Sequence, residues 1–277
     1  MKITICGVRG SIPTSGAQTI YFGGNTSCIE ISKDGWLLVL DAGTGIQQLP
    51  VNNNPGNKRI DILLTHLHMD HIQGLGFFKP LFDPLMEVHI WGPASSTHTL
   101  RSRLGRYFSP PLFPVHFRDL PSTVFLHETE NSFFDIGPFS IQSAYVIHAG
   151  ATVGYRINDG HSVFAYIPDH EPALGLNGMI KDVKWVSGGS LAFNADLLLH
   201  DAQYTPEEYK KKKGWGHSSI DDAAQFAYLA KVKKLLFSHY DPAHNDDQLR
   251  EMFRCFEEKC NYTFKYELAV EGMILEL

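Results

Sequence analysis

Four potential metal ligands lie within six residues of this chain, where an apolar run gives way to a turn. They are His66, His68, Asp70 and His71. His66 and His68 are two residues apart, so in an extended segment both side chains lie on the same side. Imidazole and carboxylate ligands together suit zinc, and also manganese or iron. A polar turn that merely happens to hold three histidines is the weaker interpretation, because matching ligands occur further along the chain.

Three more candidate ligands each follow a short apolar run of the kind that forms strands. They are His148 after residues 145–147, Asp169 after residues 164–168, and His239 after residues 235–238. Any one of them alone could be an ordinary turn residue. A single metal ion needs about three or four protein ligands. The seven candidates together therefore predict two divalent metal ions per chain, about 3.5–4 Å apart, with one carboxylate bridging them.

Short β-rich runs bounded by Gly, Pro, Asn or Asp must position these ligands. The sequence predicts strands over 3–6, 28–31, 37–40, 60–64, 88–91, 139–147, 153–157, 163–167, 197–199 and 235–237. Helical spacing, cap residues and acidic first turns predict helices over 205–213, 219 to about 233, and about 246–259. This mixture of strands and helices indicates an α/β or α+β sandwich.

The segment 97–121 fits no regular element. It holds four prolines, four aromatic residues and four arginines, but only one acid, Asp119. The arginines are Arg101, Arg103, Arg106 and Arg118. We expect a packed surface excursion. A functional arm, a lid or a dimer contact is the alternative, because long irregular loops are often functional.

Composition excludes several classes of protein. The 277 residues carry a net charge of −6, which argues against coating nucleic acid by bulk charge, although a local basic patch stays open. Hydrophobic residues make up 43%, enough for a packed core, so wholesale disorder is excluded. No run approaches the roughly 18 apolar residues of a membrane helix, and no secretory signal is visible. The four cysteines lack metal-type or redox-type spacing, so we expect a cytoplasmic protein.

The pattern His66-x-His68-x-Asp70-His71, followed in order by His148, Asp169 and His239, resembles the metallo-β-lactamase superfamily. Asp41, which follows an apolar run, is similar to the superfamily's first motif, an aspartate that supports the metal loop through hydrogen bonds. The resemblance spans essentially the whole chain. It implies a single domain over residues 1–277 with an αββα four-layer sandwich, the metals at one edge of the two sheets, and ligands from both halves.

A second set of residues resembles ribonuclease Z and the phosphodiesterases related to it. The set comprises residues 7–14, 199–203 and 216–219. In that family an acid and a second histidine form a relay to the scissile phosphate. The resemblance thus implies that His217 contacts or protonates the phosphate ester and that Asp201 orients His217. Ribonuclease Z has Glu in place of Asp201, which is one methylene shorter. The alternative is that Asp201 and Ser218 are only a turn residue and a helix cap.

The resemblance implies a phosphodiesterase that acts on cyclic nucleotides or other small phosphodiesters, including small cyclic phosphates of the PhnP type. A hydroxide activated by the two metals would attack phosphorus, and Asp70 would be both a ligand and the proton acceptor for that water. Zinc is the expected metal, with manganese or iron as alternatives. Related phosphodiesterases are commonly homodimers, so a homodimer is expected by analogy.

Three other functions stay open. A thioester hydrolase of the glyoxalase II type shares the six-residue signature but would not need His217. A tRNA 3′-processing endonuclease is disfavoured by the net charge, since tRNA-cutting members carry a dedicated basic docking arm, although the arginines of 97–121 leave it open. A non-catalytic metal-binding scaffold is disfavoured by the intact ligand set. We expect a small phosphodiester as partner and no membrane; a nucleic acid is possible but not favoured.

Overall fold

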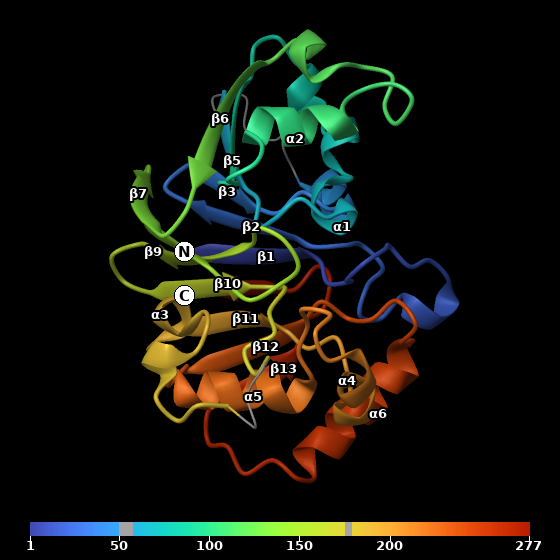
Figure 1. The fold of residues 1–277 in the computed structure, drawn as a ribbon, viewed down its shortest axis with the longest axis vertical. Coiled ribbons are helices and arrows are strands. Elements are labelled where there is room, and N and C mark those ends of the chain that lie inside the picture. Colours follow the sequence, from blue (N-terminus) through green and yellow to red (C-terminus); the bar gives the residue numbers. More distant parts are fainter. Residues whose placement is uncertain (50–57, 175–178) are drawn as a thin grey trace.

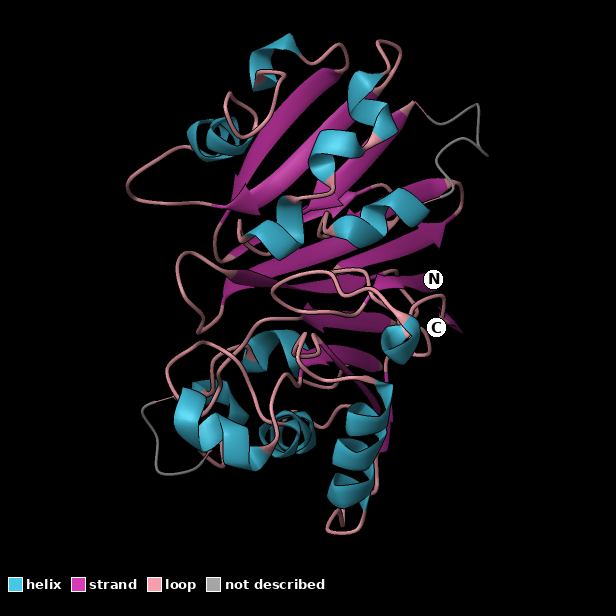
Figure 2. Cartoon of the chain, turned by 90° about the vertical axis from the view of Figure 1, so that its right-hand side faces the viewer, coloured by secondary structure: helices cyan, strands magenta, loops and turns pink. Residues whose placement is uncertain are grey.

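Two seven-stranded mixed sheets form the centre of the molecule in the computed structural model, which describes residues 1–49, 58–174 and 179–277. Figure 1 shows strands β2–β6 of the first sheet in the upper part and strands β10–β13 of the second sheet in the lower part. Figure 2 shows, from the side, helices of both halves lying in front of the strands.

The first sheet takes strands from the N-terminal half and one from the end of the chain. In spatial order these are β14 (Ile274–Glu276), β1 (Lys2–Gly7), β2 (Cys28–Lys33), β3 (Trp36–Leu40), β4 (Arg59–Leu63), β5 (Glu87–Pro93) and β6 (Thr123–Thr129). The strands from β3 to β6 are parallel, so their carboxyl ends lie at one edge of the sheet.

The second sheet repeats this plan with the C-terminal half. Its spatial order is β13 (Lys265–Leu268), β12 (Lys234–Ser238), β11 (Leu197–Asp201), β10 (Val163–Ile167), β9 (Val153–Asn158), β8 (Phe139–Tyr145) and β7 (Ser132–Ile136). The strands from β10 to β13 are parallel, and those from β7 to β10 are antiparallel.

Helices and short 3₁₀ segments connect the strands. The α-helices are α1 (Met69–Ile72), α2 (Leu100–Tyr107), α3 (Gly189–Ala192), α4 (Pro206–Lys212), α5 (Ile220–Leu229) and α6 (Asp246–Glu257). The 3₁₀ segments are η1 (Ala17–Thr19), η2 (Thr44–Gln48), η4 (Leu75–Phe77), η5 (Lys79–Phe82), η6 (Phe117–Asp119) and η7 (Val183–Trp185). Capping boxes begin α4 at Thr205 and α6 at Asn245.

Apolar side chains fill the space between the layers. One core joins β1–β3 of the first sheet to the second sheet and its helices, and includes Ile31, Tyr155 and Phe164. A second core joins the other face of the first sheet to its own helices, and includes Ile62 and Leu104. Helix, sheet, sheet and helix thus form four layers, which confirms the predicted αββα sandwich.

Every predicted strand is present, but four strands were not predicted. They are β6, β7, β13 and β14, all at or next to a sheet edge. Only one residue of β6 and one of β7 is fully buried, so the apolar pattern is weak there. Helix α5 ends at Leu229, earlier than expected, because the chain turns at Lys231 with φ of 56°.

The segment 97–121, expected to be irregular, contains helix α2 and the 3₁₀ segment η6. Thr99 caps α2 by accepting a hydrogen bond from the backbone N–H of Ser102. Only Leu100 and Leu104 of α2 are buried, so the sequence carries one apolar pair at helical spacing. No helix in the described ranges is long and apolar enough to span a bilayer.

Candidate metal centre and its supporting residues

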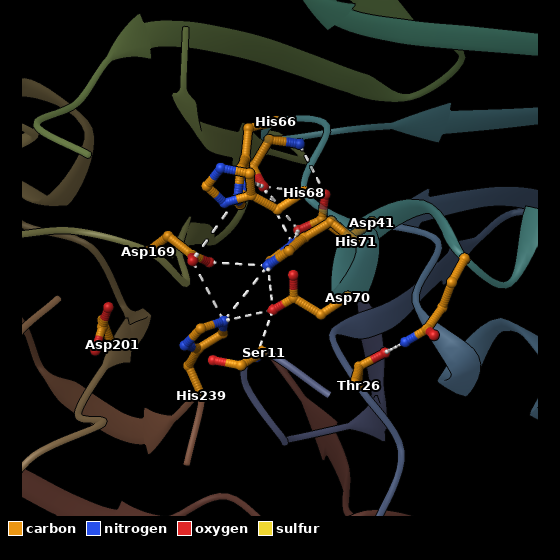
Figure 3. Close-up of polar contacts among 12 residues, drawn as sticks. Ser11, Thr26, Asp41, His66, His68, Asp70, His71, Asp169, Asp201 and His239 are labelled. Atoms are coloured by element: carbon orange, nitrogen blue, oxygen red, sulfur yellow. Dashed lines mark hydrogen bonds and ion pairs between the residues drawn. The ribbon is translucent and has the colours of Figure 1, made fainter. Parts of the chain in front are cut away.

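The seven predicted ligands meet at the ends of strands from both sheets. His66 and His68 follow β4, and Asp70 and His71 lie on α1 directly after them. The other three follow strands of the second sheet: His148 after β8, Asp169 after β10 and His239 after β12. Figure 3 shows Asp169 between the histidines of the β4–α1 turn and His239. The carboxyl ends of parallel strands therefore position most of this site.

The ligand atoms form two subsets. In the first, the Nδ1 atom of His68 lies 2.9 Å from Nε2 of His66 and 3.2 Å from Nε2 of His148. Asp169 Oδ1 is 3.8 Å from His66 Nε2 and 3.7 Å from His148 Nε2.

In the second subset, His71 Nε2 and His239 Nε2 are 3.4 Å apart. Asp70 Oδ2 lies 3.4 Å from the first of these atoms and 3.3 Å from the second. Asp169 approaches this subset too, with Oδ2 at 3.1 Å from His71 Nε2 and Oδ1 at 3.3 Å from His239 Nε2. Asp169 is a carboxylate that approaches histidines of both subsets, which is the position that a bridging carboxylate requires.

The proton positions implied by the hydrogen bonds fit a cation in this site. His71 Nδ1 is 2.8 Å from Asp41 Oδ2, and His148 Nδ1 is 2.7 Å from the carbonyl oxygen of Gly216. If each Nδ1 carries the proton, each Nε2 lone pair faces the cluster. Asp169 Oδ2 is buried there without a well-directed hydrogen bond. Lone pairs that converge in a buried site need positive charge between them, and imidazole with carboxylate is a donor set for divalent metals.

The electrostatics of the cluster favour positive charge. Burial by itself would lower the pKa of His239, but Asp169 and Asp70 outweigh burial and raise the pKa to about 9. For Asp169, burial would raise the pKa, but His239, His71 and His66 hold it well below its usual range. The carboxylates therefore stay ionised and attract cations.

Asp41 supports the ligands from behind, as the resemblance implied. It is fully buried, and its carboxylate accepts hydrogen bonds from the Thr65 N–H at 2.7 Å and from the Tyr166 hydroxyl at 2.9 Å, besides its contact with His71. Thr65 and Tyr166 were not predicted. Tyr166 sits in an apolar run, where a tyrosine looks like an ordinary core residue.

The glycine-rich turn after β1 lies against the other side of the cluster. A Cβ on Gly10 would lie 2.5 Å from Cε1 of His239, so only glycine fits. The N–H of Ser11 donates to Asp70 Oδ2 at 2.6 Å. Ser11, Asp41 and His239 all have left-handed backbones, with φ of 64°, 57° and 62°. Three residues of the site thus adopt a backbone conformation that residues other than glycine rarely adopt.

His217 and Asp201 lie together as the resemblance to ribonuclease Z implied. His217 Nδ1 lies 2.7 Å from Asp201 Oδ2. The shorter aspartate reaches because it sits at the last residue of β11, where it also accepts N–H bonds from His170, Gln203 and Ser218 at 3.0–3.2 Å. The His217 ring stacks on that of His239 with centroids 5.1 Å apart. Asp201, His217 and His239 could also hold a metal together, so the geometry allows His217 either role.

Comparison with known proteins agrees with this geometry. A family model described as a beta-lactamase superfamily domain matches residues 36–240. The chain belongs to this superfamily. The resemblance seen in the sequence is thereby confirmed, and the superfamily places the chain among metal-dependent hydrolases.

The chain is similar along almost its full length to several known proteins. It is 24% identical to a ribonuclease Z of Gemmatimonas aurantiaca, over 91% of this chain and 90% of the relative. It superposes with a TM-score of 0.71 on the metallo-beta-lactamase fold protein YhfI from Bacillus subtilis, at 18% identity and 99% and 98% coverage. A diphosphatase from the PhnP family gives a TM-score of 0.70, at 19% identity and 100% and 97% coverage.

Glu171 is a further residue of this superfamily member that the sequence did not reveal. Its fully buried carboxylate accepts hydrogen bonds from the N–H of Gly216 at 2.7 Å, the N–H of Gly214 at 2.8 Å and the Tyr209 hydroxyl at 2.9 Å. The carbonyl of Gly216 in turn contacts His148. Glu171 thus holds the loop 213–218, which touches one predicted ligand and carries His217. The signal in the sequence was a carboxylate two residues after Asp169.

Proposed function

We propose that the protein is a phosphodiesterase for small phosphodiesters, cyclic nucleotides among them, with two divalent metal ions per chain. The observation that carries this proposal is the His217–Asp201 pair, with its 2.7 Å contact directly beside the ligand cluster. A thioester hydrolase would not need a histidine placed to meet a phosphate ester.

The two subsets would each hold one ion. His66, His68 and His148 form the first site, Asp70, His71 and His239 form the second, and Asp169 is shared between them. Divalent ions in such a site lower the pKa of water towards neutrality and neutralise charge on phosphoryl oxygens. Zinc would be the expected metal, because histidine and carboxylate ligands together suit it.

The residues of the chain would supply the proton transfers. The Oδ2 atom of Asp70 accepts the Ser11 N–H and faces His71 and His239, whereas Oδ1, which has no hydrogen bond to the described residues, would accept a proton from the attacking water. Asp201 accepts a hydrogen bond from the Nδ1–H group of His217, which leaves Nε2 to contact the phosphate ester. A protonated Nε2 would donate to the leaving oxygen, and Asp201 would stabilise the imidazolium.

Cleavage of tRNA precursors is the second candidate. A specific observation favours it, because relatives named ribonuclease Z match about nine-tenths of this chain. The net charge of −6 favours a small substrate instead, although the arginines of 97–121 form a local basic segment.

The test is hydrolysis of bis(p-nitrophenyl) phosphate by protein loaded with zinc, manganese or iron(II). We expect turnover that a chelator abolishes and that metal restores. Nucleoside 2′,3′-cyclic phosphates and a 3′-extended tRNA precursor then separate the small-substrate function from the RNA function. Stoichiometric metal binding without phosphodiester turnover would favour a scaffold. Turnover of S-lactoylglutathione alone would favour a thioester hydrolase.

A further inference from the structure

A cavity of about 660 Å³ opens beside the first ligand subset. The proposed function assigns no part of the substrate to this cavity. His66 and His68 line it from the ligand cluster, Arg103 and Arg106 line it from α2, and residues 149–151 line it from the turn after His148. Figure 1 shows α2 above α1, the helix that carries Asp70 and His71. The volume lies in the range of small-molecule sites, so a substituent of a substrate held at the metal site can enter it.

Most of the cavity lining is apolar. Leu67, Met69, Ile72, Tyr107 and Leu112 all face it. Met69 and Leu112 are 52% and 72% exposed. An apolar group of a ligand would remove this surface from water.

The two arginines give the cavity a positive wall. Arg103 is fixed in place, because its guanidinium donates to the carbonyl of Pro93 and lies 3.7 Å from Glu128 Oε1. Its Nε atom is buried and has no hydrogen-bond partner. Arg106 contacts the ring of His98 at 3.0 Å, and no carboxylate of the described residues forms an ion pair with it. In a chain of net charge −6, a guanidinium without a carboxylate partner is available for an anion.

We infer that this cavity binds a nucleoside-sized substituent that carries a second phosphate, with Arg106 as the phosphate ligand. The inference rests on the proposed function and narrows its substrate class to diesters with a further phosphate group. Metals held by the ligand set would neutralise the reacting phosphate, whereas Arg106 lies outside that set and would recognise a different anionic group. Segment 97–121 then acts as a specificity element, through α2 and Leu112.

The kinetic test compares the p-nitrophenyl ester of thymidine 5′-phosphate with the same ester phosphorylated at the 3′ position. We expect the metal-loaded protein to prefer the second substrate about ten-fold in kcat/KM, the size of one charge-assisted hydrogen bond. Arg106→Ala should reduce that ratio to about one. Arg101→Ala is the matched control, since Arg101 lies on the same helix, packs on Phe117 and does not line the cavity. Arg101→Ala should keep the ten-fold ratio.

A binding test separates this inference from the proposed function. Titration calorimetry of the metal-loaded protein with thymidine 3′,5′-bisphosphate and thymidine 5′-monophosphate needs no turnover. We expect about ten-fold tighter binding of the bisphosphate, lost in Arg106→Ala and kept in Arg101→Ala. Leu112→Ala should weaken both ligands about three-fold, since one exposed apolar side chain is trimmed.

The results of these experiments distinguish failure of the proposed function from failure of the cavity assignment. Bisphosphate preference without turnover of any phosphodiester would overturn the proposed function and leave the cavity assignment standing. Turnover of bis(p-nitrophenyl) phosphate with equal affinity for the two nucleotides would overturn the cavity assignment alone. Equal loss of preference in Arg101→Ala and Arg106→Ala would also overturn it, because bulk charge would then explain the effect.

Discussion

Three imidazoles of the site are held in the same way. His71, His148 and His217 each place Nδ1 within 2.7–2.8 Å of an oxygen that belongs to Asp41, Gly216 or Asp201. Each ring is therefore fixed in orientation and in tautomer by an acceptor that is not one of the seven predicted metal ligands. The chemistry of the site depends on these acceptors as much as on the imidazoles.

Asp169→Ala tests the shared carboxylate. Because Asp169 contacts both subsets, its loss should lower the content of both metals together, from about two per chain to below one, and should reduce turnover by at least about 100-fold. Elemental analysis of protein purified without chelator, combined with kcat, measures both effects. Asp135→Ala, on the exposed side of β7, is the control and should retain both metals. Full occupancy in Asp169→Ala would show that Asp169 is only a turn residue.

His217→Ala separates binding from chemistry. If His217 is a proton donor and not a ligand, the variant should keep both metals and lose about 10²–10⁴-fold in kcat. Asp201→Ala should lose less, since it acts through His217, and the double variant should be little worse than His217→Ala. Multiplicative losses would contradict a relay. A loss of one metal in His217→Ala would make His217 a ligand, which its position beside His239 allows.

At the scale of elements, the loop 213–218 is held by one buried carboxylate, that of Glu171. Glu171 binds two of its backbone N–H groups, and Gly216 has φ of 88° with its Cα so close to His148 that an added Cβ would lie 2.5 Å from Nδ1. The hydrogen bonds to Glu171 and the close approach of Gly216 to His148 hold the loop in this position. Its geometry therefore sets the position of His217.

Glu171→Ala should lower kcat about ten-fold, with little change in KM, and should reduce the free energy of unfolding by about 1–3 kcal/mol, since buried N–H groups lose their acceptor. The readout specific to positioning is a double-variant cycle with His217→Ala. In that background Glu171→Ala should cost almost no further kcat. An unchanged ten-fold loss in the His217→Ala background would show that Glu171 does not act through His217.

The elements that the sequence predicted are those with a strong local pattern. Strands such as β10, β11 and β12 are nearly or fully buried, so they form uninterrupted apolar runs, and the ligands follow directly after two of them. Helix α2 and the edge strands β6 and β7 are half exposed, and their existence depends on what they pack against. Glu171 and Tyr166 escaped prediction for the same reason: their roles arise from partners distant in the chain.

On the scale of the whole molecule, the two halves are interlocked. Strand β14, from the end of the chain, pairs with β1 and completes the first sheet. Arg9, after β1, is fully buried and donates to the carbonyl oxygens of Gly23 at 2.8 Å and His244 at 2.7 Å. It also lies 3.8 Å from Asp246, which begins α6. The N-terminal turn that touches the ligands is thereby tied to the loop after His239.

Arg9→Met should destabilise the protein by about 3 kcal/mol, because two buried carbonyls and a carboxylate lose their donor while the volume is roughly kept. Urea unfolding followed by circular dichroism measures this. Arg118→Met is the control, since the Arg118 side chain is 78% exposed and should change the free energy of unfolding by less than about 0.5 kcal/mol. Equal stability of the two variants would mean that the two halves do not depend on Arg9.

The left-handed backbone at Ser11, Asp41 and His239 bears on how this protein can be engineered. Each such residue costs roughly 1–2 kcal/mol relative to an ordinary conformation, and glycine would avoid that cost. Laboratory selection for heat resistance alone would therefore favour glycine at these positions, including Asp41 and His239, whose side chains the site needs. Substitutions intended to raise thermal stability are better made in the surface loops and helix caps, and these three positions should be kept unchanged.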